Sequence, residues 1–206
     1  MFSVLSMMID CFSSLIFVGL GILWMTRKDS NKKMKLSLIL FATYLLAVFS
    51  VVGLPNVSYI RFDLKVNVIP FIDSMKSPIS AILNIILFIP FGVFLPLLWP
   101  KRYEGWQSVV KSGLLLTLGI ELAQLFTLRL TDINDLIMNS FGAYLGFIFY
   151  QKGAKRFKGL EGVAVEDENI PPFLTIIFVF CVMFFLGSLL SNGIWELILF
   201  RIIYFI

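Results

Sequence analysis

Long apolar runs separated by short polar connections are the feature that most constrains the fold of this chain. Six runs occupy residues 4–25, 36–54, 80–99, 111–128, 135–150 and 173–190. Most are close to the length of about 20 residues that an α-helix needs to cross a bilayer. Only 15% of the residues are charged, against about 25% in a typical soluble domain. The sequence therefore predicts an all-α, polytopic transmembrane helix bundle of about six spans, in which residues 1–206 form a single integral membrane domain.

The basic residues are distributed unevenly among the connections, and their distribution predicts an orientation. The connections after the first, third and fifth runs hold most of the 17 Lys and Arg residues, namely Arg27, Lys28, Lys32, Lys33, Lys35, Lys101, Arg102, Lys111, Lys152, Lys155, Arg156 and Lys158. Connections rich in Lys and Arg face the cytoplasm. The N-terminus is therefore predicted to be extracytoplasmic.

The end of the chain differs from the six runs. Residues 194–206 are apolar but too few for a spanning helix, and they carry Trp195, Glu196 and Arg201. We therefore expect residues 191–206 to form an interfacial or packed C-terminal tail.

A polar cluster interrupts the fourth and fifth runs. Its members are Glu121, Gln124, Arg129, Asp132, Asp135 and Asn139. An ionisable side chain costs roughly 3 kcal/mol at the centre of a membrane on insertion scales, so such residues are paired, hydrated or functional. The tight turn between the two runs makes their helices antiparallel neighbours. The predicted orientation places the whole cluster in the outer half of the membrane.

The third run supplies a further wall for this cluster. Asn84 lies near its outer end, and Pro90 and Pro96 interrupt its helix. A proline inside a helix frees a carbonyl group and bends the axis, which either serves packing alone or opens a groove toward the outer leaflet. On the fifth run, Gly142 and Gly146 form a GxxxG pattern that allows another helix to approach closely.

The residue types that are missing exclude several chemistries. The chain has no histidine, which removes the commonest general base and the commonest metal ligand. Cys11 and Cys181 lie inside apolar runs, where two small buried residues are expected rather than a disulfide or a metal site. The short basic connections do not form an element that could read nucleic acid. We expect no metal, no cofactor and no nucleic-acid partner.

Three blocks of sequence also point to a known family. They are Asn84-Ile-Ile-Leu-Phe-Ile-Pro-Phe-Gly, then Ile120-Glu-Leu-Ala-Gln, then Arg129 followed by Thr131-Asp-Ile-Asn-Asp-Leu-Ile-Met-Asn-Ser-Phe-Gly-Ala. In this order and spacing, the blocks resemble the signature of the VanZ-like family and define a motif core at residues 84–146. The resemblance implies a multi-pass protein of the bacterial cytoplasmic membrane, linked to tolerance of teicoplanin-like lipoglycopeptide antibiotics. The matched polar positions are Asn84, Glu121, Gln124, Arg129, Asp132, Asp135 and Asn139, with Pro90, Gly92 and Gly142 as structural members.

These residues favour a non-enzymatic module that binds or handles an amphiphile in the outer leaflet. The expected partners are membrane lipids, a lipid-linked envelope component or a lipoglycopeptide. Arg129 would engage an anionic group, because its planar fork suits phosphate or carboxylate, while Asp132 and Asp135 orient it.

Three alternatives stay open for the same residues. The cluster could serve architecture alone, by closing the helical hairpin through hydrogen bonds and an ion pair. It could form the path of a lipid or ion transporter or of a flippase. Finally, Glu121 and Asp135 could act as the paired acid and base of an intramembrane enzyme.

Overall fold

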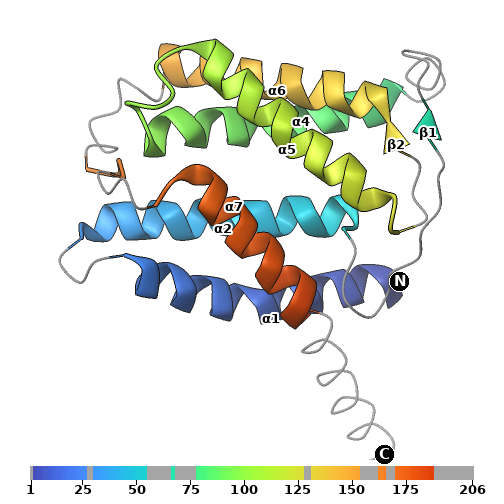
Figure 1. The fold of residues 1–206 in the computed structure, drawn as a ribbon, viewed down its shortest axis with the longest axis horizontal. Helices are drawn as coiled ribbons and strands as arrows, with labels where there is room; N and C mark the ends of the chain where they lie inside the picture. The colour runs from blue at the N-terminus through green and yellow to red at the C-terminus, as the bar shows by residue number, and fades with distance from the viewer. Residues whose placement is uncertain are drawn as a thin grey trace, which may run out of the picture.

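Figure 1 shows the fold, which is that of a computed structural model. The structure describes residues 2–26, 30–54, 66–67, 78–127, 131–153, 162–165 and 170–187, with side chains except at 2–13, 66–67, 131 and 187. These ranges contain the helices α1 (Phe2–Met25), α2 (Lys32–Val52), α4 (Pro78–Leu98), α5 (Trp106–Gln124), α6 (Ile133–Lys152) and α7 (Pro172–Val182). A π-helical turn, Met183–Gly187, continues α7, and the two-residue strands β1 (Val66–Asn67) and β2 (Thr131–Asp132) pair in parallel.

The helices alternate in direction across the molecule (Figure 1). At one end of the bundle α1, α4 and α6 finish and α2, α5 and α7 begin. The basic residues at that end include Lys32, Lys33, Lys35, Lys101, Arg102 and Lys152. Positive charge therefore gathers at the end that the sequence predicts to be cytoplasmic, while the side of the membrane that each end faces stays a prediction.

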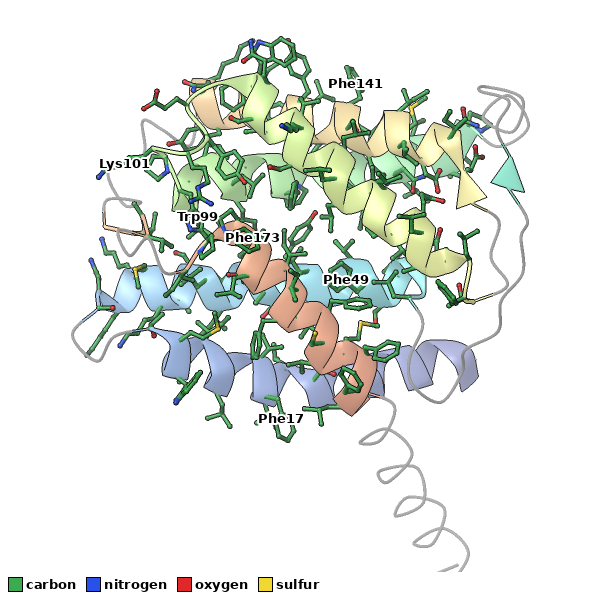
Figure 2. The ribbon with its side chains drawn as sticks, viewed as in Figure 1. Phe17, Phe49, Trp99, Lys101, Phe141 and Phe173 are labelled. Carbon is green, nitrogen blue, oxygen red and sulfur yellow. The ribbon has the colours of Figure 1, made fainter. Side chains whose placement is uncertain are left out.

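The outer surface of the bundle is apolar. Phe17 on α1 is 40% exposed and Phe141 on α6 is 47% exposed, and they lie at opposite edges of the molecule (Figure 2). An apolar surface of this extent suits lipid rather than water. Within the described ranges, α2 and α4 are the helices that are long and apolar enough to cross a membrane. Six passes stay a prediction, and the predicted tail at 191–206 lies outside the described residues.

Glycine brings α4 and α6 into backbone contact. A Cβ atom added at Gly142 would meet the carbonyl oxygen of Ile85, and one added at Gly146 would meet the carbonyl oxygen of Ile89. Only residues without a side chain permit this approach. The close contact expected from the GxxxG pattern is confirmed, and the partner helix is α4.

The prolines of α4 lie within a helix that runs without interruption from Pro78 to Leu98. The Tyr44 hydroxyl of α2 donates a hydrogen bond of 2.7 Å to the Leu87 carbonyl, in the turn that precedes Pro90. Pro90 has no N–H to donate to the Ile86 carbonyl, which weakens the helical bonding of that turn. A side chain of α2 can then use a carbonyl group of the turn as an acceptor. The expectation that the prolines interrupt this helix is therefore wrong, and the contact supports the packing alternative.

Candidate functional site

The candidate site lies where α4, α5 and α6 meet, and an N-cap at the start of α6 organises it. The Asp132 carboxylate accepts hydrogen bonds from the backbone N–H and from the Nδ2 of Asn134, each 2.9 Å long. Aspartate is among the residues preferred at this position because it satisfies an N–H group that the helix leaves unpaired. The cap starts α6 at Ile133, two residues earlier than the apolar run predicts.

Glu121 joins α5 to this cap. Its side chain is only 2% exposed, and its Oε2 accepts a hydrogen bond of 3.0 Å from the backbone N–H of Asp132. Asp132 and Asp135 both interact electrostatically with Glu121. Three carboxyl groups from the end of α5 and the start of α6 therefore form one group.

Asn84 supplies the contribution of α4. Its Nδ2 donates a hydrogen bond of 2.6 Å to Oδ1 of Asp135. The two residues are 51 positions apart in the sequence, so this bond fixes the beginning of α4 against the beginning of α6. Asn84, Glu121 and Asp135 thus bring three helices together, in the arrangement expected for a third wall.

Asn139 extends the polar group along the interface of α5 and α6. Its Nδ2 donates a hydrogen bond of 2.8 Å to Oγ1 of Thr117, and both side chains are buried. Its Oδ1 is buried without a hydrogen-bond partner among the described residues. The sequence analysis missed Thr117, although its position four residues before Glu121 places it on the same helix face.

Gln124 and Arg129 are the two remaining predicted residues. Gln124 lies three residues after Glu121 on α5, and its Nε2 donates a hydrogen bond of 2.9 Å to the Val52 carbonyl at the end of α2. Arg129 lies outside the described residues, so its pairing stays a prediction. Asn134 was missed by the sequence analysis and is 3% exposed; its position two residues after the capping Asp132 was the available signal.

The chemistry of the site is that of hydrogen-bond acceptors. Carboxylate and amide oxygens converge on it, and these groups suit ligands with hydroxyl or ammonium donors. Among the residues with described positions, no group of three or more Cys, Asp and Glu could hold a metal ion.

Antiparallel helices, apolar outer faces and two helices long and apolar enough to cross a bilayer together point to a helical membrane protein, with a buried polar cluster between three of its helices. A family model described as VanZ/LLP1 matches residues 41–155, which is more than half of the chain. The chain belongs to the VanZ/LLP1 family. The matched range includes every residue of the predicted site and the whole motif core. Comparison with curated proteins and with solved structures gives no match.

Proposed function

We propose that this chain is a multi-pass protein of the bacterial cytoplasmic membrane that binds an amphiphile in the outer leaflet through its polar cluster. Through this binding it raises tolerance of teicoplanin-like lipoglycopeptides. Membership of the VanZ/LLP1 family supports a role in the bacterial envelope. The observation that carries the binding role is the burial of Glu121, 2% exposed, beside two further carboxyl groups in an apolar bundle.

Burying acidic groups together is unfavourable for stability. Each loses the hydration that it has in water, and close like charges repel one another. Hydrophobic residues of similar volume often pack at least as well in such a place. A fold that nevertheless holds Glu121, Asp132 and Asp135 together is best explained by a ligand that uses them.

The polar side chains of the cluster indicate the chemistry of the ligand. Acceptor oxygens of Asp135 and Glu121 suit hydroxyl or amino groups, and Arg129 is predicted to engage phosphate or carboxylate. A lipid headgroup that carries both an anionic group and donors satisfies this set. A lipid-linked envelope component and the lipid-bearing end of a lipoglycopeptide belong to the same chemical class.

An architectural role competes with this proposal, because the bonds Asn84–Asp135 and Glu121–Asp132 each join two elements. The two roles differ in how they depend on charge. Asp135→Asn keeps an oxygen that can accept the bond from Asn84 but removes the negative charge. A role in binding predicts a stable but inactive variant, whereas a role in architecture tolerates the change because the bond remains.

The test uses the full chain expressed in a susceptible bacterium. We expect the wild type to raise the inhibitory concentration of teicoplanin more than that of a glycopeptide without a lipid tail. Asp135→Asn should abolish this effect at an unchanged membrane level and unchanged melting temperature. The matched control is Glu104→Gln, which removes an exposed carboxylate before α5 and should leave tolerance intact. Full tolerance in Asp135→Asn, at the membrane level of the wild type, would refute the binding role.

A lipid or ion transporter is the second candidate function. The observation that favours it is the buried pair Thr117–Asn139, which continues the polar line inward from Glu121. Polar residues that extend into the membrane often mark a transport path. Proteoliposomes with a fluorescent lipid would distinguish transport from binding. Lipid movement between leaflets that is lost in Glu121→Gln would indicate transport, whereas a lipid that stays in its leaflet would support binding alone.

A further inference from the structure

A cavity of about 360 Å³ lies between α2, α5 and α7. In Figure 1, α5 and α7 run across the front of the bundle, with α2 behind α7. The lining is almost wholly apolar and includes Phe49, Leu116, Gly119, Ile120, Phe173 and Ile176. Figure 2 labels two of these residues, Phe49 on α2 and Phe173 at the start of α7. We call this cavity the α5–α7 groove.

The groove opens on the outside of the bundle. Three lining side chains are more than half exposed: Leu115 of α5 at 58%, Phe173 of α7 at 58% and Ile177 of α7 at 53%. In a membrane these side chains face hydrocarbon. The groove is therefore reached from the lipid phase.

The end of the groove that lies toward the start of α5 is closed by a hydrogen-bonded pair of hydroxyl groups. The Tyr103 hydroxyl and Ser112 Oγ are 3.0 Å apart. Burial raises the pKa of the Tyr103 phenol above its ordinary value, while Ser112 and the charge of Arg102 lower it. The phenol is thus neutral at physiological pH and its polar atom is satisfied, so this end offers no charge to a ligand.

The other end of the groove reaches the candidate site. Ala123 and Leu54 line that end, and Gln124, the residue after Ala123, donates its hydrogen bond to the Val52 carbonyl, two residues before Leu54. Ile120, which also lines the groove, precedes the buried Glu121. From Ser112 to Ala123 the groove follows α5 for about 16 Å. One helix therefore carries the polar site on one face and the groove on another.

We propose that the α5–α7 groove binds one acyl chain of a membrane phospholipid whose headgroup lies at the polar cluster. This inference rests on the proposed function, because it names the amphiphile that the cluster binds. The cavity volume lies near the lower end of the range of about 300–1,000 Å³ for ligand pockets, which suits a single chain. A helix of a second protein is too large, since about 16 Å of a rod 10 Å wide occupies roughly 1,200 Å³.

Gly119 allows a sharp test of this proposal. Gly119 lines the groove and a Cβ atom added there meets no atom within 4 Å, so the side chain of Gly119→Leu begins in open space at the wall of the groove. Gly19→Leu on α1 is the matched control, because Gly19 also has nothing within 4 Å and does not line the groove. Both changes replace glycine inside a helix by a strong helix former, so neither is expected to lower stability.

The assay uses purified protein in nanodiscs that contain phosphatidylglycerol with a photoreactive group in one acyl chain. After illumination, mass spectrometry should locate the label on peptides that contain Ile120 and Ala123 of α5 or Ile176 of α7. We expect Gly119→Leu to reduce this labelling about tenfold, which corresponds to about 1.4 kcal/mol of binding free energy, and Gly19→Leu to leave it unchanged. Equal labelling of wild type and Gly119→Leu would overturn the proposal. Dimers in native mass spectra that Gly119→Leu dissociates would also overturn it, because they would identify a second copy as the occupant.

The two proposals can fail separately. Unchanged labelling in Gly119→Leu, together with lost drug tolerance in Asp135→Asn, would refute the groove and support the polar site. Reduced labelling in Gly119→Leu, together with full tolerance in Asp135→Asn, would support the groove as a lipid site and refute the proposed function.

Discussion

Replacing Gly146 by alanine tests whether backbone contact between α4 and α6 holds this bundle together. The added Cβ would lie 2.8 Å from Cα of Gly92 and 3.0 Å from its carbonyl carbon, and closer still to the carbonyl oxygen of Ile89. These atoms belong to the backbone, so rotation of a side chain cannot relieve the overlap. The two helices must therefore move apart along the part of α6 that contains Gly142 and Gly146.

The size of the effect follows from the contacts that such a movement weakens. A gap of about 0.5–1 Å forfeits a quarter to a half of each van der Waals contact, and each contact contributes about 0.1–0.2 kcal/mol. If the contacts affected equal those of one buried leucine, about 50 in number, the loss is roughly 1–5 kcal/mol, with a middle value near 3 kcal/mol. The greater helix propensity of alanine offsets about 1 kcal/mol of this loss. The expected net destabilisation of Gly146→Ala, taken from the middle value, is therefore about 2 kcal/mol.

Unfolding of the purified protein in detergent micelles, followed by circular dichroism, measures this free energy. The control is Gly119→Ala on α5, where an added Cβ meets nothing within 4 Å. That variant gains the same helix propensity without an overlap, so it should be more stable than the wild type by up to about 1 kcal/mol. If Gly146→Ala is as stable as Gly119→Ala, the reasoning about close packing of α4 and α6 is wrong.

Two further predictions concern hydrogen bonds between helices. Thr117→Val removes the acceptor of the Asn139 amide and should lower the free energy of unfolding by about 1–2 kcal/mol, whereas a second change, Asn139→Leu, should restore most of the loss because no polar group then stays unpaired. A double variant that is less stable than Thr117→Val in the same unfolding assay would contradict this account. Tyr44→Phe removes the donor to the Leu87 carbonyl and should cost about 1 kcal/mol, measured by thermal unfolding. An unchanged melting temperature would show that the turn before Pro90 does not depend on that bond.

The sequence predicts the helices better than their ends. Each of the six apolar runs corresponds to a helix, because apolar length reports which segments can be buried in lipid. The ends depend on single hydrogen bonds that hydrophobicity does not report. Asp132 starts α6 at Ile133 rather than at residue 135, and α5 ends at Gln124, four residues before its apolar run does. Similarly, α7 changes to a π-helix at Met183 inside a uniformly apolar run.

The predictable part of the candidate site is the part that rests on local spacing. Glu121 and Asp132 meet across a tight turn, and the antiparallel pairing of their helices could be inferred from its length. The partner of Gln124 could not be inferred, because Val52 is 72 residues away and belongs to the end of another helix. Helix-face spacing shows which residues lie together on one helix, but the neighbour that each face meets is decided by the packing of the whole bundle.

The α5–α7 groove shows why the apolar half of an amphiphile site is invisible in the sequence. Glu121 and Asp135 stand out because ionisable residues are rare in spans. Leu116, Ile120 and Ile176 do not stand out, because a groove for an acyl chain and a surface that faces lipid are made of the same residue types. Only a space between helices distinguishes the two, and here it ends at Ala123, whose neighbour Gln124 contacts α2. The bond from Gln124 to the end of α2 thus places an amide beside both the polar site and the apolar groove, where the two proposals together place the glycerol region of a bound lipid.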